Sequence, residues 1–114
     1  KRSAHPVAQW LHRAEAGEAA AEVRLGGGFT ATAEEEAGPM LFVAGGIGIT
    51  PLASILGHAW EAGPAPGFRA LLLHSAVAPA ELALRADVQR LERRAAGRVR
   101  SVAHVTDAEW RGRE

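Results

Sequence analysis

Three short apolar runs alternate with two longer amphipathic segments over most of this chain. Residues 40–44, 69–75 and 98–105 have the apolar character of buried strands. Between them, residues 51–62 and 79–96 place apolar side chains at helical spacing, and a glycine follows each segment. Strands that alternate with helices of ordinary length indicate a parallel sheet with right-handed crossovers. The sequence therefore predicts an α/β fold with a Rossmann-like sheet.

The first 38 residues carry weaker signals. Apolar residues at helical spacing predict a short helix over residues 5–14, and residues 18–25 have the alternation of an extended segment. Residues 31–38 form an acidic connector that we expect to be mobile. A Gly-Pro pair closes this connector and is the best domain boundary in the chain. The sequence therefore predicts one unit over residues 1–38 and a second over residues 39–114.

A glycine-rich turn joins the first strand of the predicted sheet to the first helix. Gly45, Gly46 and Gly48 let the backbone turn sharply and let a ligand approach it without a Cβ in the way. We expect Thr50 to be the N-cap of the helix and Pro51 to be its first residue. Free N–H groups and a helix N-terminus at the end of a buried strand can hold a pyrophosphate. The turn therefore predicts a nucleotide site, and an ordinary strand–helix turn that binds nothing is the alternative.

Segments after the other two strands are expected at the same edge of the sheet. Ligands of parallel sheets bind beyond the carboxyl ends of the strands, so the turn, residues 74–77 and residues 106–110 should come together. Ser75 is placed to reach a ribose or an adenine phosphate, and a simple turn hydroxyl is the other interpretation. No acid follows the second strand to accept from ribose hydroxyls; the nearest is Glu81.

Composition narrows the classes of function. Thirteen basic and thirteen acidic residues cancel, so nothing indicates a nucleic-acid partner, and no apolar run has the length of a membrane span. The absence of cysteine excludes disulfides and thiolate metal sites. The five histidines are scattered without metal-ligand spacing. For His74, at the end of the second strand, we expect a buried structural role, with a contact to a cofactor as the alternative.

Two other nucleotide-binding motifs do not match the turn. A P-loop needs a lysine followed by Ser or Thr after its last glycine, and this turn has Ile49 and Thr50 instead. The standard dinucleotide fingerprint has a third glycine where this chain has Pro51, so G-x-G-x-x-P is a variant of it.

This variant, GGIGITP followed by PLASIL, resembles the nicotinamide domain of the ferredoxin–NADP reductase superfamily. The resemblance continues in the strand LLHSA, residues 72–76, and in the segment PAEL, residues 79–82. Within the superfamily, HPVAQWLH, VRLGGGF, AGGIGITPLASILGHA and HVT are similar to the oxidoreductase NAD-binding domain-containing protein 1 group, described in vertebrates as mitochondrial. The sequence ends before the family's Cys-Gly-Pro segment, so we expect a partial enzyme.

The resemblance implies a dinucleotide site built from the glycine turn, the helix start and one serine. Its members would be Gly45, Gly46, Ile47, Gly48, Ile49, Thr50 and Pro51, with Ser75 near the adenosine ribose. It also implies that residues 5–29 are the tail of a flavin-binding β-barrel, with FAD bound in the complete protein. In such enzymes a hydride passes from nicotinamide to flavin, and no side chain need act as an acid or base.

The resemblance also indicates the cofactor preference and the cellular compartment. Val77 stands where NADP-preferring members have a basic residue, which favours NADH, and a mitochondrial location is implied. Trp110 is similar to a family segment that borders the adenine side, and a position at a free chain end is the alternative. The predicted function is the NAD(P)H-binding portion of a flavin-dependent oxidoreductase with an unidentified electron acceptor. A noncatalytic α/β module that acts only in binding is the alternative.

Overall fold

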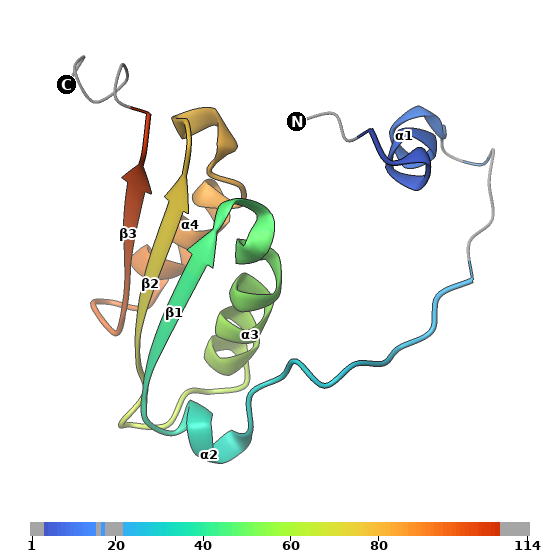
Figure 1. Ribbon diagram of the computed structural model, residues 1–114. Helices are drawn as coiled ribbons and strands as arrows, with labels where there is room; N and C mark the ends of the chain where they lie inside the picture. Colours follow the sequence, from blue (N-terminus) through green and yellow to red (C-terminus); the bar gives the residue numbers. More distant parts are fainter. Residues whose placement is uncertain (1–3, 16, 18–21, 108–114) are drawn as a thin grey trace.

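A computed structural model describes residues 4–15, 17 and 22–107. Its helices and strands follow one another along the chain as Figure 1 shows. In chain order they are α1 (Pro6–Arg13), α2 (Ala33–Glu36), β1 (Pro39–Gly45), α3 (Ile49–Glu61), β2 (Arg69–Ala76), α4 (Arg85–Arg94) and β3 (Val99–Val105). Two short 3₁₀ turns, Gly46–Gly48 and Pro79–Glu81, precede α3 and α4. The three strands confirm the predicted runs to within one residue at each end.

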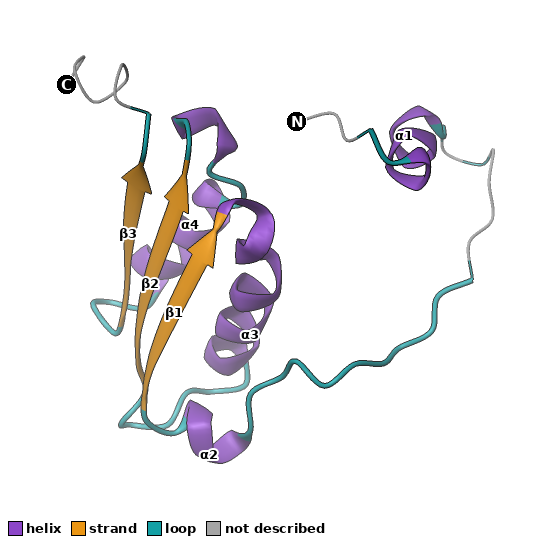
Figure 2. Ribbon diagram, in the orientation of Figure 1, coloured by secondary structure: helices purple, strands orange, loops and turns teal. Residues whose placement is uncertain are grey.

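The three strands form one parallel sheet in the order β1-β2-β3. The register sets Phe42 beside Leu72 and Leu72 beside Ser101. In Figure 2 the sheet forms one layer, with α3 and α4 in the layer behind it. This arrangement confirms the predicted α/β fold with a Rossmann-like parallel sheet.

The core lies between the sheet and these two helices. Phe42 and Leu72 on the sheet pack in one cluster with Leu56 of α3 and Val88 of α4. Phe68, which leads into β2, is fully buried in the same cluster. Burial of such a side chain contributes about 1.5–3 kcal/mol relative to exposure, so this cluster is the main source of the fold's stability.

The opposite face of the sheet is exposed, although it is also apolar. Strand residues alternate between two faces, and the residues that point away from the helices are the exposed ones. The apolar ones among them are Leu41, Val43, Leu71, Leu73 and Val102. This set is called the open sheet face below. A parallel sheet normally has both faces covered, so the described residues complete only one side of the sandwich.

The start of α3 differs from the prediction. The helix begins at Ile49 with Gly48 as its N-cap, so Thr50 lies inside the first turn and Pro51 is the third helical residue. Thr50 Oγ1 donates to the Ile47 carbonyl oxygen at 3.2 Å instead of accepting from an N–H group. The prediction of Thr50 as the N-cap was wrong because the 3₁₀ turn runs directly into the helix and moves the start two residues earlier.

The second helix is also shorter than predicted. Pro79 begins only a 3₁₀ turn, and α4 itself starts at Arg85. Leu82, with a ψ of 79°, leaves the helical region directly after the turn, and Leu84, with a φ of 57° in the left-handed region, is the N-cap of α4. The apolar positions predicted for the inner face remain buried or half-buried, as Leu82, Val88 and Leu91 are.

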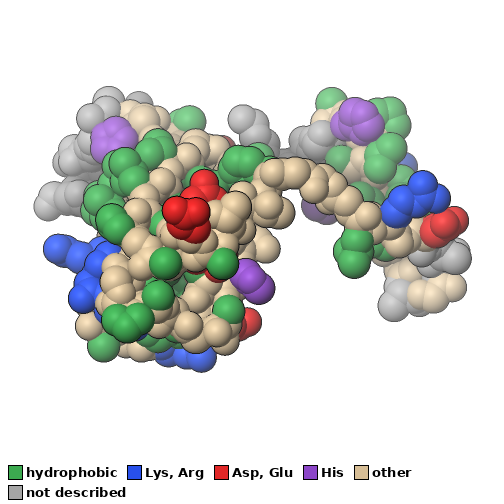
Figure 3. Space-filling model, turned by 90° about the horizontal axis from the view of Figure 1, so that it is seen from below, with side chains coloured by type: hydrophobic (Ala, Val, Ile, Leu, Met, Phe, Trp, Pro, Cys, Tyr) green, Lys and Arg blue, Asp and Glu red, His purple; other side chains and the backbone are tan. Residues whose placement is uncertain are grey.

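The segment before the sheet contains more local order than predicted. The helix α1 is confirmed, and the described part of the predicted extended stretch, residues 22–25, is a loop. The connector is not without structure, since it contains α2, whose N-cap Thr32 forms a capping box with Glu35. Figure 3, seen from below, shows acidic side chains gathered at the end of the molecule where α2 lies.

The capping box also affects the pKa of Glu35. The Thr32 N–H donates to Glu35 Oε2 at 2.7 Å, and the Glu35 N–H donates to Thr32 Oγ1 at 3.3 Å. The Thr32 backbone bond, with a smaller contribution from the Thr32 hydroxyl, holds the pKa of Glu35 below its ordinary value.

Candidate nucleotide-binding site

The carboxyl edge of the sheet brings together the segments that the sequence singled out. The register sets Gly45 at the end of β1 beside Ser75 of β2, and Ser75 beside His104 of β3. Predicted site residues 45–51 are contiguous along the turn and the first turn of α3. Ser75 is half-buried next to them. The structure therefore places all eight predicted site residues at one corner of the sheet.

The backbone of the turn explains one of its glycines and leaves space at the others. Gly46 has a φ of 51°, in the left-handed region that disfavours a side chain. Gly45 and Gly48 have ordinary φ values of −110° and −59°. A Cβ added at any of the three would meet no atom within 4 Å. Gly46 thus sets the conformation of the turn, whereas Gly45 and Gly48 leave its surface bare.

The turn is fixed to the fold at two points. Ile49, the first residue of α3, is fully buried in the core cluster. On the other side, His74 Nε2 lies 2.8 Å from the Gly46 carbonyl oxygen, and this ring is 7% exposed. Between these points, the Ile47 side chain is 72% exposed. The turn is therefore attached to the core through Ile49 and His74, and its outer surface is open to a ligand.

Beyond the strands, backbone hydrogen bonds extend the edge of the sheet. The Thr106 N–H donates to the Ala76 carbonyl and the Asp107 N–H to the Val77 carbonyl, both at 2.9 Å. These bonds bring Asp107, which follows β3, beside Val77, which follows β2. Sequence reasoning sought an acid directly after the second strand and did not predict that one would arrive from the third. Trp110, predicted near the adenine, lies outside the described residues.

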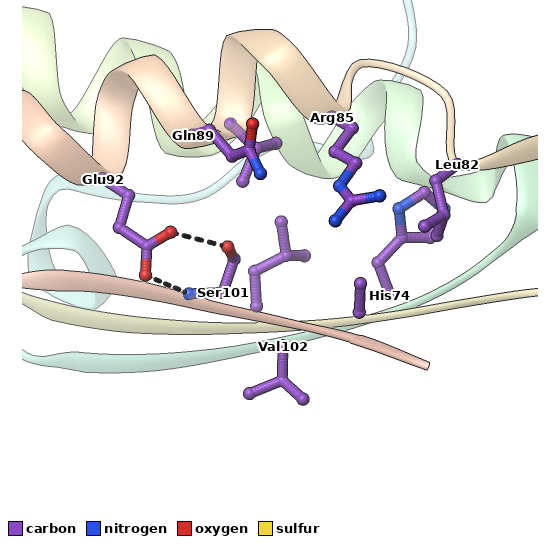
Figure 4. A pocket seen from close by; sticks show the side chains of 10 residues that line it. His74, Leu82, Arg85, Gln89, Glu92, Ser101 and Val102 are labelled. Atoms are coloured by element: carbon purple, nitrogen blue, oxygen red, sulfur yellow. Dashed lines mark hydrogen bonds between the residues drawn. The ribbon is translucent and has the colours of Figure 1, made fainter. Parts of the chain in front are cut away.

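A pocket lies behind this edge, between α4 and the sheet. Figure 4 shows His74 and Leu82 toward one end of the pocket, and Glu92 with Ser101 toward the other. The Glu92 carboxylate accepts from the Ser101 N–H at 3.0 Å and from the Ser101 hydroxyl at 2.8 Å. These bonds hold α4 against β3. The pocket therefore has the Glu92–Ser101 contact at one end and His74 at the other.

Other kinds of site find no support in the described part of the chain. No group of three or more His, Asp or Glu residues there could hold a metal ion. Among the same residues, no helix is both long and apolar enough to cross a membrane. His74 is buried, as expected from the sequence, and its partner is a backbone carbonyl.

Comparison with known families agrees with this geometry. Residues 42–114 match the family model of the oxidoreductase NAD-binding domain, and this range is more than half of the chain. The chain belongs to this family. The matched range contains the glycine turn, both sheet-covering helices and Ser75. The candidate site at the carboxyl edge of the sheet therefore lies within an oxidoreductase NAD-binding domain.

One solved structure extends the comparison. The NAD-binding domain is similar to the cytochrome b5 reductase domain of Ulva prolifera nitrate reductase, with a TM-score of 0.52 and 25% sequence identity. The match covers 59% of this chain and 24% of that chain, so this chain spans about a quarter of that structure. No curated protein sequence matches this chain. Family and structure together support the ferredoxin-reductase superfamily.

Proposed function

We propose that this NAD-binding domain holds NAD(P)H at the glycine turn and presents its nicotinamide to a flavin in a reductase. The observation that carries the proposal is the bare turn itself. Three glycines without a neighbour at their Cβ positions lie at the N-terminus of a 13-residue helix. Such a terminus offers N–H donors and a positive dipole end to a pyrophosphate.

Each part of the dinucleotide has residues of suitable chemistry. Gly45, Gly46 and Gly48 allow the pyrophosphate to reach the backbone. The Ile47 N–H in the turn and the Thr50 N–H at the start of α3 are the candidate donors, since the Ile49 N–H already donates to the Ile47 carbonyl. Ser75, next to Gly45 in the register, offers a hydroxyl to the adenosine ribose. The cofactor supplies the hydride, and this chain's contribution is to bind and orient it.

NADH is the proposed form of the cofactor. Recognition of an adenosine 2′-phosphate uses a cation, and Val77 stands where the family resemblance would place one. The backbone bond from Asp107 to Val77 brings an acidic residue to the same corner. A carboxylate suits ribose hydroxyls and repels a phosphate, which favours NADH over NADPH.

The flavin belongs to another part of the proposed enzyme. Residues 1–38 are proposed as the end of a flavin-binding barrel and residues 39–114 as the start of the NAD-binding domain. In the described residues, α1 buries none of its side chains, and Val23, Leu25 and Phe29 are exposed. These residues alone do not fit a flavin. Membership of the oxidoreductase NAD-binding domain-containing protein 1 group, with a mitochondrial location, is part of the same proposal.

An NMR titration of the ¹⁵N-labelled chain with NADH tests the proposal. We expect saturable shifts of the amides of residues 45–50 and of Ser75, with weaker binding of NADPH in a parallel titration. ADP-ribose should reproduce the shifts of the turn, because it contains the same pyrophosphate. A dispersed spectrum without shifts at millimolar NADH would contradict the proposal and favour a noncatalytic scaffold.

A further inference from the structure

His74 is a buried polar side chain whose hydrogen bond reaches into the glycine turn. It lies on β2, and its partner carbonyl is 28 residues earlier in the sequence, at Gly46. The imidazole Nε2 is 2.8 Å from this oxygen, which is the length of a good hydrogen bond. A carbonyl oxygen only accepts, so Nε2 carries the proton and donates.

This bond fixes the orientation of one peptide group in the turn. The peptide between Gly46 and Ile47 is trans, since no cis peptide occurs among the described residues. In a trans peptide the C=O and the following N–H point in opposite directions. Because the Gly46 oxygen points at His74, the Ile47 N–H points away from it. The donor that the proposed site needs is therefore aimed by a side chain on the neighbouring strand.

The turn has reason to need such a support. Gly46 is the residue with positive φ, and glycine has access to many other backbone conformations at little cost. Ile47 gives little anchorage from its side chain, which is largely exposed. On the strand side, the His74 ring is the partner that selects one orientation of this peptide.

We propose that His74 is a positioning residue for the dinucleotide: it holds the Gly46 carbonyl so that the Ile47 N–H faces the pyrophosphate. This inference rests on the proposed function, because it assigns a role within the same site. His74 does not touch the cofactor in this account. It acts through the backbone, by keeping the turn in the conformation that binds.

Two substitutions separate this role from simple core packing. His74→Leu fills the buried space but removes the donor, whereas His74→Gln keeps an amide N–H at nearly the position of Nε2. Ser101→Ala is the matched control, because it removes a hydrogen bond on the far side of the same pocket without touching the turn. For each variant we would measure the Kd for NADH by titration and the free energy of unfolding by urea denaturation.

We expect His74→Leu to weaken NADH binding by about twofold to tenfold, the usual net effect of one hydrogen bond. His74→Gln should restore most of the affinity. Ser101→Ala should bind NADH as tightly as the unsubstituted chain, even if its free energy of unfolding is lower. The Ile47 amide resonance of the free chain should shift in His74→Leu and return in His74→Gln.

Each failure has its own signature. If the unsubstituted chain does not bind NADH, both the proposed function and this role are overturned. If it binds NADH and His74→Leu binds equally well, only the positioning role is overturned. Equal losses of affinity in His74→Leu and His74→Gln, following their losses of stability, would also overturn it, since packing alone would then explain the effect.

Discussion

Two alanine substitutions in the glycine turn should have opposite effects on stability, although they add the same methyl group two residues apart. Gly46 has a φ of 51° and Gly48 a φ of −59°. An L-residue in the left-handed region costs about 1–2 kcal/mol, so Gly46→Ala should destabilise the fold by that amount. At Gly48, the backbone is already helical and the Cβ meets no atom within 4 Å. Gly48→Ala should therefore stabilise it by about 0.4–1 kcal/mol, through the unfolded state.

The two variants thus differ by about 1.5–3 kcal/mol in the free energy of unfolding. For a domain of this size, each kcal/mol corresponds to about 4–8 °C in Tm. Thermal unfolding followed by circular dichroism measures the difference directly, and urea unfolding supplies the free energies. Equal stabilities for Gly46→Ala and Gly48→Ala would refute the conformation assigned to the turn.

NADH binding separates stability from function in the same pair. Both methyl groups would stand on the bare surface that the pyrophosphate is proposed to approach. Gly48→Ala should therefore lose affinity for NADH while it gains stability, a combination that damage to the fold cannot produce. Retention of the full NADH affinity by Gly48→Ala would argue against a pyrophosphate at this position.

Two further predictions concern the connector and the loop between α3 and β2 that lies against it. A Cβ at Gly67 would lie 2.9 Å from the Ala37 backbone oxygen, so Gly67→Ala should destabilise the chain by about 1–3 kcal/mol in urea unfolding. Gly57→Ala, in open space on α3, is the control and should stabilise by up to about 1 kcal/mol. The lowered pKa of Glu35 means that its capping bond stabilises α2 above the ordinary glutamate pKa and is lost as pH falls through the lowered value. In Thr32→Ala, an NMR titration should find the Glu35 pKa raised only partway, because the backbone donor remains; an unchanged pKa would contradict this.

The order of elements was predictable because buried parallel strands read as short apolar runs. Leu71, Leu72 and Leu73 illustrate why: the covered face needs Leu72, and the open sheet face is apolar as well. The alternation within each strand therefore does not appear in the sequence as a change from apolar to polar. The sequence predicts the strands, but it does not say which face the helices cover.

Helix starts were less predictable because tertiary contacts decide them. Thr50 and Pro51 are good residues for an N-cap and a first turn, yet the 3₁₀ turn runs directly into the helix, which begins at the buried Ile49. Pro79 does begin a turn, but this turn ends at Glu81. Leu84 then precedes α4 in the left-handed conformation, for which no local signal marks a leucine. By contrast, the Thr32–Glu35 capping box has a clear sequence signature and could have been predicted.

Part of the candidate site was predictable from the sequence and part was not. Its three glycines lie within four consecutive residues, so a local motif predicted all of them, and the parallel register places Ser75 beside Gly45. The support from His74 joins residues 28 positions apart, and no spacing rule relates an imidazole to a carbonyl on the next strand. Sequence reasoning predicted that His74 is buried and could not predict what its ring would hold.

The open sheet face affects how the stability and binding experiments should be compared. Its exposed leucines and valines form an apolar surface of the kind that promotes association between molecules. Association would raise the apparent stability as the protein concentration rises, so unfolding should be measured at several concentrations. The glycine turn lies at the carboxyl edge of the sheet. The Gly46 carbonyl contacts His74, which is buried on the covered side of β2. Shifts of the turn amides on NADH addition should therefore be independent of protein concentration. A concentration dependence of those shifts would instead link the site to whatever covers the open sheet face.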